Sequence, residues 1–159
     1  MQNSPLFSAD SVLFNVSAGS QKQLFQELAS VLMQTNQLEN KNITSTDIVS
    51  AAIERERLGS TGVGNGVALP HARLKGIDSV TAVFAKLSQP IEFDSIDDRA
   101  VDLVVFLLAP SDAGGAHLRA LAKVSRLLRR KDVRARLREA PSAEASYTIL
   151  TETQDAKAA

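Results

Sequence analysis

The sequence predicts a three-layer α/β domain, in which a sheet lies between helices on both of its faces. Segments with the composition of strands alternate along the chain with segments whose apolar residues recur at helical spacing. Residues 100–109 are apolar almost throughout, which is typical of a central strand buried on both faces. The 159 residues show no repeat of fixed period. We therefore expect a single domain over residues 1–159, with a core at about residues 8–152.

The N-terminal part of the chain is expected to contribute one strand and two helices. In chain order, we predict a strand over 11–17, a helix over 21–34, a polar loop over 36–42 and a helix over 47–58. The strand is rich in β-branched and aromatic residues, and the first helix has an apolar face. Thr44 and its neighbours are cap candidates for the second helix, and Gly59 is a natural stop. Arg55 falls on the same face of this helix as core residues.

The remainder of the chain is expected to supply the other strands and three helices. We predict strands over 66–70, 79–87, 91–94 and 100–109, a helix beginning around residue 117, and helices over 131–137 and 142–151. Pro70 ends the first of these strands and fixes the backbone before His71, so His71 is expected to be exposed at a strand end. Ser111 or Asp112 is the expected cap of the helix that follows residue 110, and Leu118 is expected on its apolar face.

Composition argues against several classes of function. The absence of cysteine removes disulfides, thiolate metal sites and cysteine nucleophiles, and it fits a reducing cytoplasm. The N-terminal residues lack the basic and apolar regions of a signal peptide, and no run approaches the roughly 20 apolar residues of a membrane helix. We therefore expect a soluble cytoplasmic protein without direct membrane insertion. The 18 basic and 18 acidic residues balance, so the net charge favours neither nucleic acid nor membrane as a partner.

One segment, from Lys123 to Arg138, is strongly basic and contains Asp132 as its only acid. Such a charge run is usually a solvated helix face, which is the interpretation that we favour. Two alternatives stay open, a surface for an acidic protein partner and a surface for nucleic acid. The second is the weaker, because no aromatic residue is interleaved with the basic ones, and we expect no nucleic-acid partner.

The only two histidines of the chain, His71 and His117, each lie beside a glycine-rich stretch. Residues 59–66 precede the first, and residues 112–116 precede the second. Glycine lets backbone N–H groups turn toward an anion and lets a partner approach closely, while imidazole can be both neutral and nucleophilic near pH 7. The pairing indicates phosphoryl chemistry on a histidine.

Other interpretations of these motifs fit less well. The spacing of Gly62, Gly64 and Gly66 matches neither a dinucleotide fingerprint nor a nucleotide-binding P-loop. A metal centre would need ligands beyond two widely spaced histidines, so we expect no metal and no cofactor. A serine hydrolase would need a Gly-x-Ser-x-Gly motif, which the chain lacks. For His71 alone, a structural histidine bonded at a strand end remains an alternative.

The stretch from Glu54 to Arg73 resembles the active-site signature of the enzyme IIA components of the bacterial phosphoenolpyruvate-dependent phosphotransferase system, the fructose/mannitol class. It reads Glu-Arg-Glu-Arg-Leu-Gly-Ser-Thr-Gly-Val-Gly-Asn-Gly-Val-Ala-Leu-Pro-His-Ala-Arg. The resemblance continues through residues 102–110 and 113–128, and it is strongest with the nitrogen-related, regulatory branch. It implies a mixed sheet between helical layers, here of about five strands, which agrees with the pattern described above.

The resemblance also implies roles for individual residues. His71 is the histidine that is phosphorylated, and Arg55 and His117 complete the active site. These roles make chemical sense, because a neutral imidazole can attack a phosphoryl group while a guanidinium and a second imidazole stabilise the charge on its oxygens. Residues expected to bind phosphate or the partner, or else only to form a turn, are Gly62, Gly64, Asn65 and Gly66.

Two functions are consistent with this resemblance. In the first, which we favour, the protein accepts a phosphoryl group from a small phosphocarrier protein and regulates nitrogen- or potassium-related targets by its phosphorylation state. The resemblance suggests potassium-transport proteins and sensor kinases among those targets. In the second, the protein is a free-standing sugar-transport IIA component that passes the phosphoryl group to a fructose- or mannitol-type IIB domain. An interaction domain with an inactive site is a third alternative.

Overall fold

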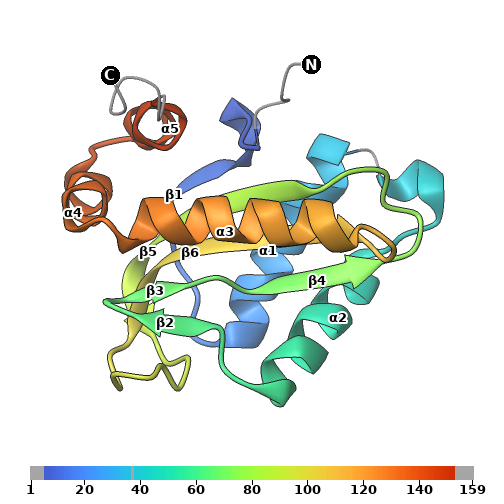
Figure 1. The fold of residues 1–159 in the computed structure, drawn as a ribbon, viewed down its shortest axis with the longest axis horizontal. Coiled ribbons are helices and arrows are strands. Elements are labelled where there is room, and N and C mark those ends of the chain that lie inside the picture. Colours follow the sequence, from blue (N-terminus) through green and yellow to red (C-terminus); the bar gives the residue numbers. More distant parts are fainter. Residues whose placement is uncertain (1–5, 37, 153–159) are drawn as a thin grey trace.

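A computed structural model describes residues 6–36 and 38–152 of the chain. In this part of the chain, six strands form one mixed sheet, and helices cover both of its faces (Figure 1). The predicted three-layer α/β class is confirmed, and the sheet has one strand more than the expected five. None of the described helices is long and apolar enough to cross a membrane.

The elements follow the predicted alternation of strands and helices. The strands are β1 (Val12–Val16), β2 (Gly62–Gly64), β3 (Val67–Ala68), β4 (His71–Leu74), β5 (Thr81–Ile91) and β6 (Val101–Pro110). The helices are α1 (Gln21–Asn36), α2 (Ser45–Leu58), α3 (Gly114–Arg129), α4 (Lys131–Glu139) and α5 (Ala143–Thr151), with short 3-10 helices η1 (Ala9–Ser11) and η2 (Leu38–Lys41). The strand order is β1-β5-β6-β3-β2, and β4 also pairs with β6.

β6 is the central strand, and it separates two hydrophobic clusters. It runs antiparallel to β5 and parallel to both β3 and β4. Alternate β6 residues face opposite helical layers, with Val104, Phe106 and Leu108 packed with α1 and α2, and Leu103, Val105 and Leu107 packed with α3, α4 and α5. This burial on both faces explains why the strand is apolar at every position from Leu103 to Ala109. The parallel pairing of β4 with β6 sets the position of β4 beside it.

The start of α2 is fixed by a reciprocal cap. Thr44 Oγ1 accepts a hydrogen bond from the Asp47 backbone N–H at 3.1 Å, and the Asp47 carboxylate accepts one from the Thr44 N–H at 2.9 Å. The helix therefore begins at Ser45, slightly before the predicted start. Ile48 and Ala52 face the core, and Arg55 is half-buried one turn further along, as its place on that face predicts.

The predicted strands differ from the observed ones in extent. The strand expected over 79–87 is β5, which continues to Ile91 with an irregular register between Lys86 and Ile91. The separate strand expected over 91–94 was wrong, because only Ile91 of these residues pairs in the sheet. The short strand β2 was not predicted, and neither was β4, which is formed by residues 71–74. These residues are extended because they pair in parallel with β6, with His71 opposite Leu107. His71 is therefore half-buried at the start of a strand, and the expectation that it is exposed was wrong.

The first turn of α3 differs from the prediction in its start and in its buried face. Ala113 is the N-cap, so the caps expected at Ser111 or Asp112 were wrong. His117 points inward and is 4% exposed, whereas Leu118 is 62% exposed. Because the residue of this turn that faces the core is a histidine, the spacing of apolar residues in the sequence did not identify the buried face of the helix.

Much of the basic segment at the end of α3 and in α4 is used in structural contacts. Its ion pairs are Arg130 with Asp132, Arg136 with Glu152, and Arg138 with Asp102. Arg134 Nη1 donates to the backbone carbonyls of Leu128 at 3.0 Å and Arg129 at 2.7 Å, which caps the end of α3. These contacts support a structural role for the segment over a nucleic-acid surface.

Candidate active site

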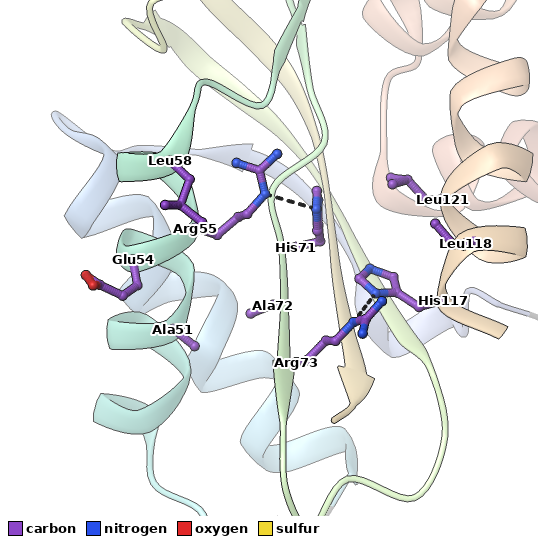
Figure 2. A pocket seen from close by; sticks show the side chains of 10 residues that line it. All are labelled: Ala51, Glu54, Arg55, Leu58, His71, Ala72, Arg73, His117, Leu118 and Leu121. Atoms are coloured by element: carbon purple, nitrogen blue, oxygen red, sulfur yellow. Dashed lines mark hydrogen bonds between the residues drawn. The ribbon is translucent and has the colours of Figure 1, made fainter. Parts of the chain in front are cut away.

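A cavity of about 540 Å³ lies between α2, β4 and the first turns of α3 (Figure 2). Its lining consists of Ala51, Glu54, Arg55, Leu58, His71, Ala72, Arg73, His117, Leu118 and Leu121. The three residues expected to be catalytic are thus brought together, although they come from separate segments of the chain. Two arginines and two histidines on one cavity form a site suited to an anion.

The hydrogen bonds of the His71 ring fix which of its two nitrogens carries the proton. Its Nδ1 lies 2.9 Å from the backbone carbonyl oxygen of Leu69. Because a carbonyl oxygen can only accept, the proton of the neutral ring is on Nδ1, and Nε2 keeps its lone pair. Pro70 and the pairing of β4 with β6 fix the backbone on which this ring is mounted.

Arg55 approaches this lone pair from the last turn of α2. Its Nε donates to His71 Nε2 at 3.2 Å, and its Nη1 donates to the backbone carbonyl of Gly59 at 2.7 Å (Figure 2). The second contact anchors the guanidinium at the C-terminal end of the helix, where carbonyl groups lack helical partners. A positive charge is therefore held beside the unprotonated nitrogen of His71.

His117 has one ring nitrogen bound and the other without a partner. Its Nδ1 accepts a hydrogen bond from Arg73 Nε at 3.0 Å. Its Nε2 is buried and has no hydrogen-bond partner among the described residues. Since guanidinium can only donate, the neutral ring carries its proton on Nε2. His117 thus holds a buried N–H group whose acceptor is missing.

The two imidazole rings face each other edge to face. Their centroids are 5.2 Å apart, and the angle between their planes is 70°. Burial lowers the pKa of His71, opposed by the hydrogen bond to Leu69 and assisted by the nearby charge of Arg55. Burial also lowers the pKa of His117, and its neighbours His71 and Arg73 act in the same direction. Both rings are therefore neutral at pH 7, which is the state that a nucleophile requires.

Arg73 is a site residue that sequence reasoning missed. It lies two residues after His71 in β4, and residues two apart in a strand project from the same side. That relationship was hidden because β4 was not predicted. The sequence pattern that could have revealed Arg73 is the alternation of two polar residues, His71 and Arg73, around apolar Ala72, which is buried in the core.

The glycine-rich residues 62–66 form the β2–β3 hairpin, and they are not among the residues that line the cavity. Gly66 has φ of +76°, and a Cβ there would collide with the Arg138 guanidinium and lie 2.9 Å from Asp102 Oδ1. Arg138 also donates to the backbone carbonyl of Asn65 at 2.6 Å. A side chain at position 66 would therefore be strained by the positive φ, and the ends of Arg138 and Asp102 would have to shift to admit it. Binding of phosphate or a partner at Gly62, Gly64, Asn65 and Gly66 stays a prediction.

The fold and site define a phosphoryl-transfer component. Residues 5–153 match the family described as phosphoenolpyruvate-dependent sugar phosphotransferase system, EIIA 2, and the chain belongs to this family. The nitrogen regulatory protein of Bradyrhizobium diazoefficiens is 40% identical over 91% of this chain and 92% of its own length. That of Pseudomonas aeruginosa is also 40% identical, over 90% of each chain. The expected resemblance to the nitrogen-regulatory branch is confirmed.

Solved structures agree with this assignment. The nitrogen regulatory protein IIA-Ntr from Neisseria meningitidis superimposes with a TM-score of 0.83 at 34% identity, covering 92% of this chain and 97% of that one. The mannitol IIA of Escherichia coli has the same fold, with a TM-score of 0.74 at 18% identity and coverage of 91% of this chain and 99% of that one.

A sugar-specific relative is also similar in sequence. A fructose-specific EIIA component of Haloferax volcanii is 38% identical over 65% of this chain and 68% of its own length.

Proposed function

We propose that the protein is a phosphohistidine carrier that accepts a phosphoryl group on His71 and regulates other proteins by its phosphorylation state. One observation carries this proposal. The unprotonated Nε2 of His71 faces the cavity beside a fixed guanidinium, and a second imidazole nearby holds an N–H donor without an acceptor. A phosphoryl group bound to His71 would supply the acceptor that His117 Nε2–H lacks. It would also place its oxygens beside Arg55, whose Nε now contacts the His71 lone pair.

The transfer exchanges one N–P bond for another. The lone pair of His71 Nε2 attacks the phosphorus of a phosphohistidine on the donor, a new N–P bond forms, and the donor imidazole leaves with the electrons of the old bond. In the transition state, charge is spread over three phosphoryl oxygens. Arg55 and His117 stabilise that charge, and each aimed donor is worth about 2–4 kcal/mol. The chain itself needs no cofactor for this step.

The donor in this proposal is a small phosphocarrier protein. Leu58 on α2 is 86% exposed and Leu118 on α3 is 62% exposed, and they lie on opposite sides of the histidine pair (Figure 2). Large exposed apolar side chains around a polar centre are typical of a protein-binding surface. A phosphohistidine on the surface of a donor protein could reach His71 while that protein contacts Leu58 and Leu118. Because such phosphocarriers act in the cytoplasm, we propose the same location for this protein.

Regulation is favoured over sugar transport by the relatives named nitrogen regulatory protein, which cover most of the chain. A phosphoryl group adds about two negative charges to the surface between Leu58 and Leu118, enough to strengthen or abolish a contact there. Potassium transporters and sensor kinases are the proposed targets. The alternative, transfer to a fructose- or mannitol-type IIB domain, is supported by the similarity to a fructose-specific EIIA component.

Intact-mass spectrometry at neutral to alkaline pH tests the carrier function. The protein is incubated with phosphoenolpyruvate, enzyme I and the matching phosphocarrier, in parallel with His71→Ala and with the control Ser60→Ala, whose hydroxyl is near the site in sequence but outside the cavity. We expect one acid-labile phosphoryl adduct on wild type and on the control, and none on His71→Ala. An adduct that persists on His71→Ala would overturn the proposal. Subsequent transfer to a IIB domain would favour the sugar-transport alternative.

A further inference from the structure

The tautomer of His117 is decided by a single hydrogen bond. A neutral imidazole can carry its proton on either nitrogen, and the partners of the ring select between the two forms. The described contacts of the His117 ring nitrogens consist of one bond, from Arg73 Nε to Nδ1 at 3.0 Å. Because a guanidinium has no acceptor and stays protonated, this bond requires a lone pair on Nδ1. The proton is thereby placed on Nε2.

The other tautomer would work against a phosphoryl group on His71. With the proton on Nδ1, Nε2 would present a lone pair, and a lone pair repels phosphoryl oxygens instead of binding them. His117 is 4% exposed, and its ring centroid lies 5.2 Å from that of His71. Water therefore has little access to bridge this lone pair to the phosphoryl oxygens. An unsatisfied buried N–H also costs about 1–3 kcal/mol, so His117 Nε2–H is held ready for an acceptor.

Arg73 is well placed to impose this tautomer. It shares β4 with His71 and projects from the same side of the strand, while Ala72 between them is buried in the core. Pairing of Arg73 with Ala109 of β6 fixes its backbone. One short strand therefore carries both the nucleophile and the residue that orients the donor.

We propose that Arg73 is a positioning residue that holds His117 as its Nε2–H tautomer, so that His117 can donate to the phosphoryl group on His71. This inference rests on the proposed phosphorylation of His71. It assigns Arg73 a different task from Arg55, which contacts the reacting nitrogen itself. The competing role for Arg73 is a direct charge on the phosphoryl oxygens.

Two substitutions of equal length separate these roles. In glutamine, the side-chain N–H₂ occupies the same position along the chain as Arg Nε, so Arg73→Gln keeps a donor and loses the charge. In methionine, a methyl group occupies that position, so Arg73→Met loses both. Lys75→Met removes the next cation along the chain, which follows the end of β4 and lies outside the cavity, and serves as the control.

Two readouts are measured on all four proteins. The first is ¹⁵N NMR of the His117 ring in the unphosphorylated state, which distinguishes the two tautomers. The second is the rate of phosphoryl transfer from the phosphocarrier. We expect Arg73→Gln to keep the Nε2–H tautomer and most of the rate. Arg73→Met should lose the uniform tautomer and slow transfer roughly 10–100-fold, which is the range found for groups that orient a metal-bound imidazole.

Three outcomes would overturn the proposal. The Nε2–H tautomer could persist in Arg73→Met, Arg73→Met could transfer at the wild-type rate, or Arg73→Gln and Arg73→Met could be slowed equally with the tautomer unchanged. The last result would assign Arg73 a direct role through its charge. If wild type itself accepts no phosphoryl group, the proposed function fails, and the NMR comparison still decides whether Arg73 sets the tautomer.

Discussion

The imidazole rings of His71 and His117 lie edge to face with their centroids 5.2 Å apart, and an arginine holds one nitrogen of each. The two arginines bind opposite nitrogens, since Arg55 donates to Nε2 of His71 and Arg73 donates to Nδ1 of His117. The rings are therefore opposite tautomers, one offering a lone pair and the other an N–H group. This asymmetry suits two identical side chains to the different tasks that we propose for them.

His117→Ala is expected to slow phosphoryl transfer to His71 by about 10²–10³-fold, because it removes a donor aimed at the developing charge. His117→Gln should recover part of that rate, since its amide N–H₂ can reach the position of Nε2. The measurement is the single-turnover rate of transfer from the phosphocarrier, with the folded state checked by circular dichroism. Equal rates for His117→Ala and wild type would remove His117 from the reaction.

Arg55→Gln and Arg55→Met are both expected to slow transfer by about 10²-fold or more, because the positive charge on the phosphoryl oxygens is lost in each. The glutamine variant keeps a donor toward His71 Nε2, so its slow rate would show that the charge is needed. Arg57→Met is the matched control, since Arg57 is exposed on the same helix and pairs with Glu54. A fast Arg55→Gln would show that the hydrogen bond suffices.

The rate of transfer is expected to be independent of pH above about 6.5 and to fall at lower pH, because protonation of His71 removes its lone pair. The inflection should lie below 6.5, since burial lowers the pKa of His71 from that ordinary value. A pH–rate profile of wild type measures it. The inflection should move upward when a neighbouring positive charge is removed in Arg55→Gln, and an inflection above 6.5 in wild type would contradict the geometry.

The free energy of unfolding is expected to fall at low pH, as the rate of transfer does. Both histidines have pKa values below 6.5 in the folded state, so the unfolded chain binds more protons than the folded one as pH falls below that value. This contribution to stability is fully present above pH 6.5 and is lost as pH falls toward the folded pKa values. Urea unfolding across this range, compared with the double variant His71→Gln/His117→Gln, isolates the effect. An unchanged pH dependence in the double variant would refute it.

Gly66→Ala is expected to destabilise the fold by about 1–3 kcal/mol, because residue 66 has φ of +76° and the added Cβ would collide with Arg138. Gly114→Ala is the control, since a Cβ at this helical glycine meets no atom within 4 Å. Urea unfolding measures both. A KM for the phosphocarrier that rises in Gly66→Ala while kcat is kept would support the predicted partner role of the hairpin, and an unchanged KM would restrict Gly66 to the turn.

Much of the fold was accessible from sequence, because the helices and the long strands have strong periodic patterns. The missed strands, β2 and β4, have only three and four residues, and β4 pairs with β6 through long-range contacts, so their local sequence carried little signal. The inward position of His117 was also hidden, since an imidazole on the core side of a helix breaks the apolar pattern that identifies that side.

The site could be predicted only as a set of residues. The motifs indicated His71, His117 and Arg55 as candidates for the chemistry, and the fold brings them to one cavity. Their protonation states depend on the Leu69 carbonyl and on Arg73, which are partners that no motif specifies. Tertiary hydrogen bonds decide which nitrogen is reactive, so this part of the mechanism required the structure.

The most direct test of the central claim is ¹⁵N NMR of histidine-labelled protein after phosphorylation by the phosphocarrier, which identifies the ring nitrogen that bears phosphorus. The hydrogen bond from His71 Nδ1 to Leu69 predicts phosphorylation at Nε2 of His71 alone, with His117 retained as an unmodified Nε2–H donor. Phosphorus on Nδ1 of His71, or on His117, would contradict the assignment of nucleophile and donor on which the account depends.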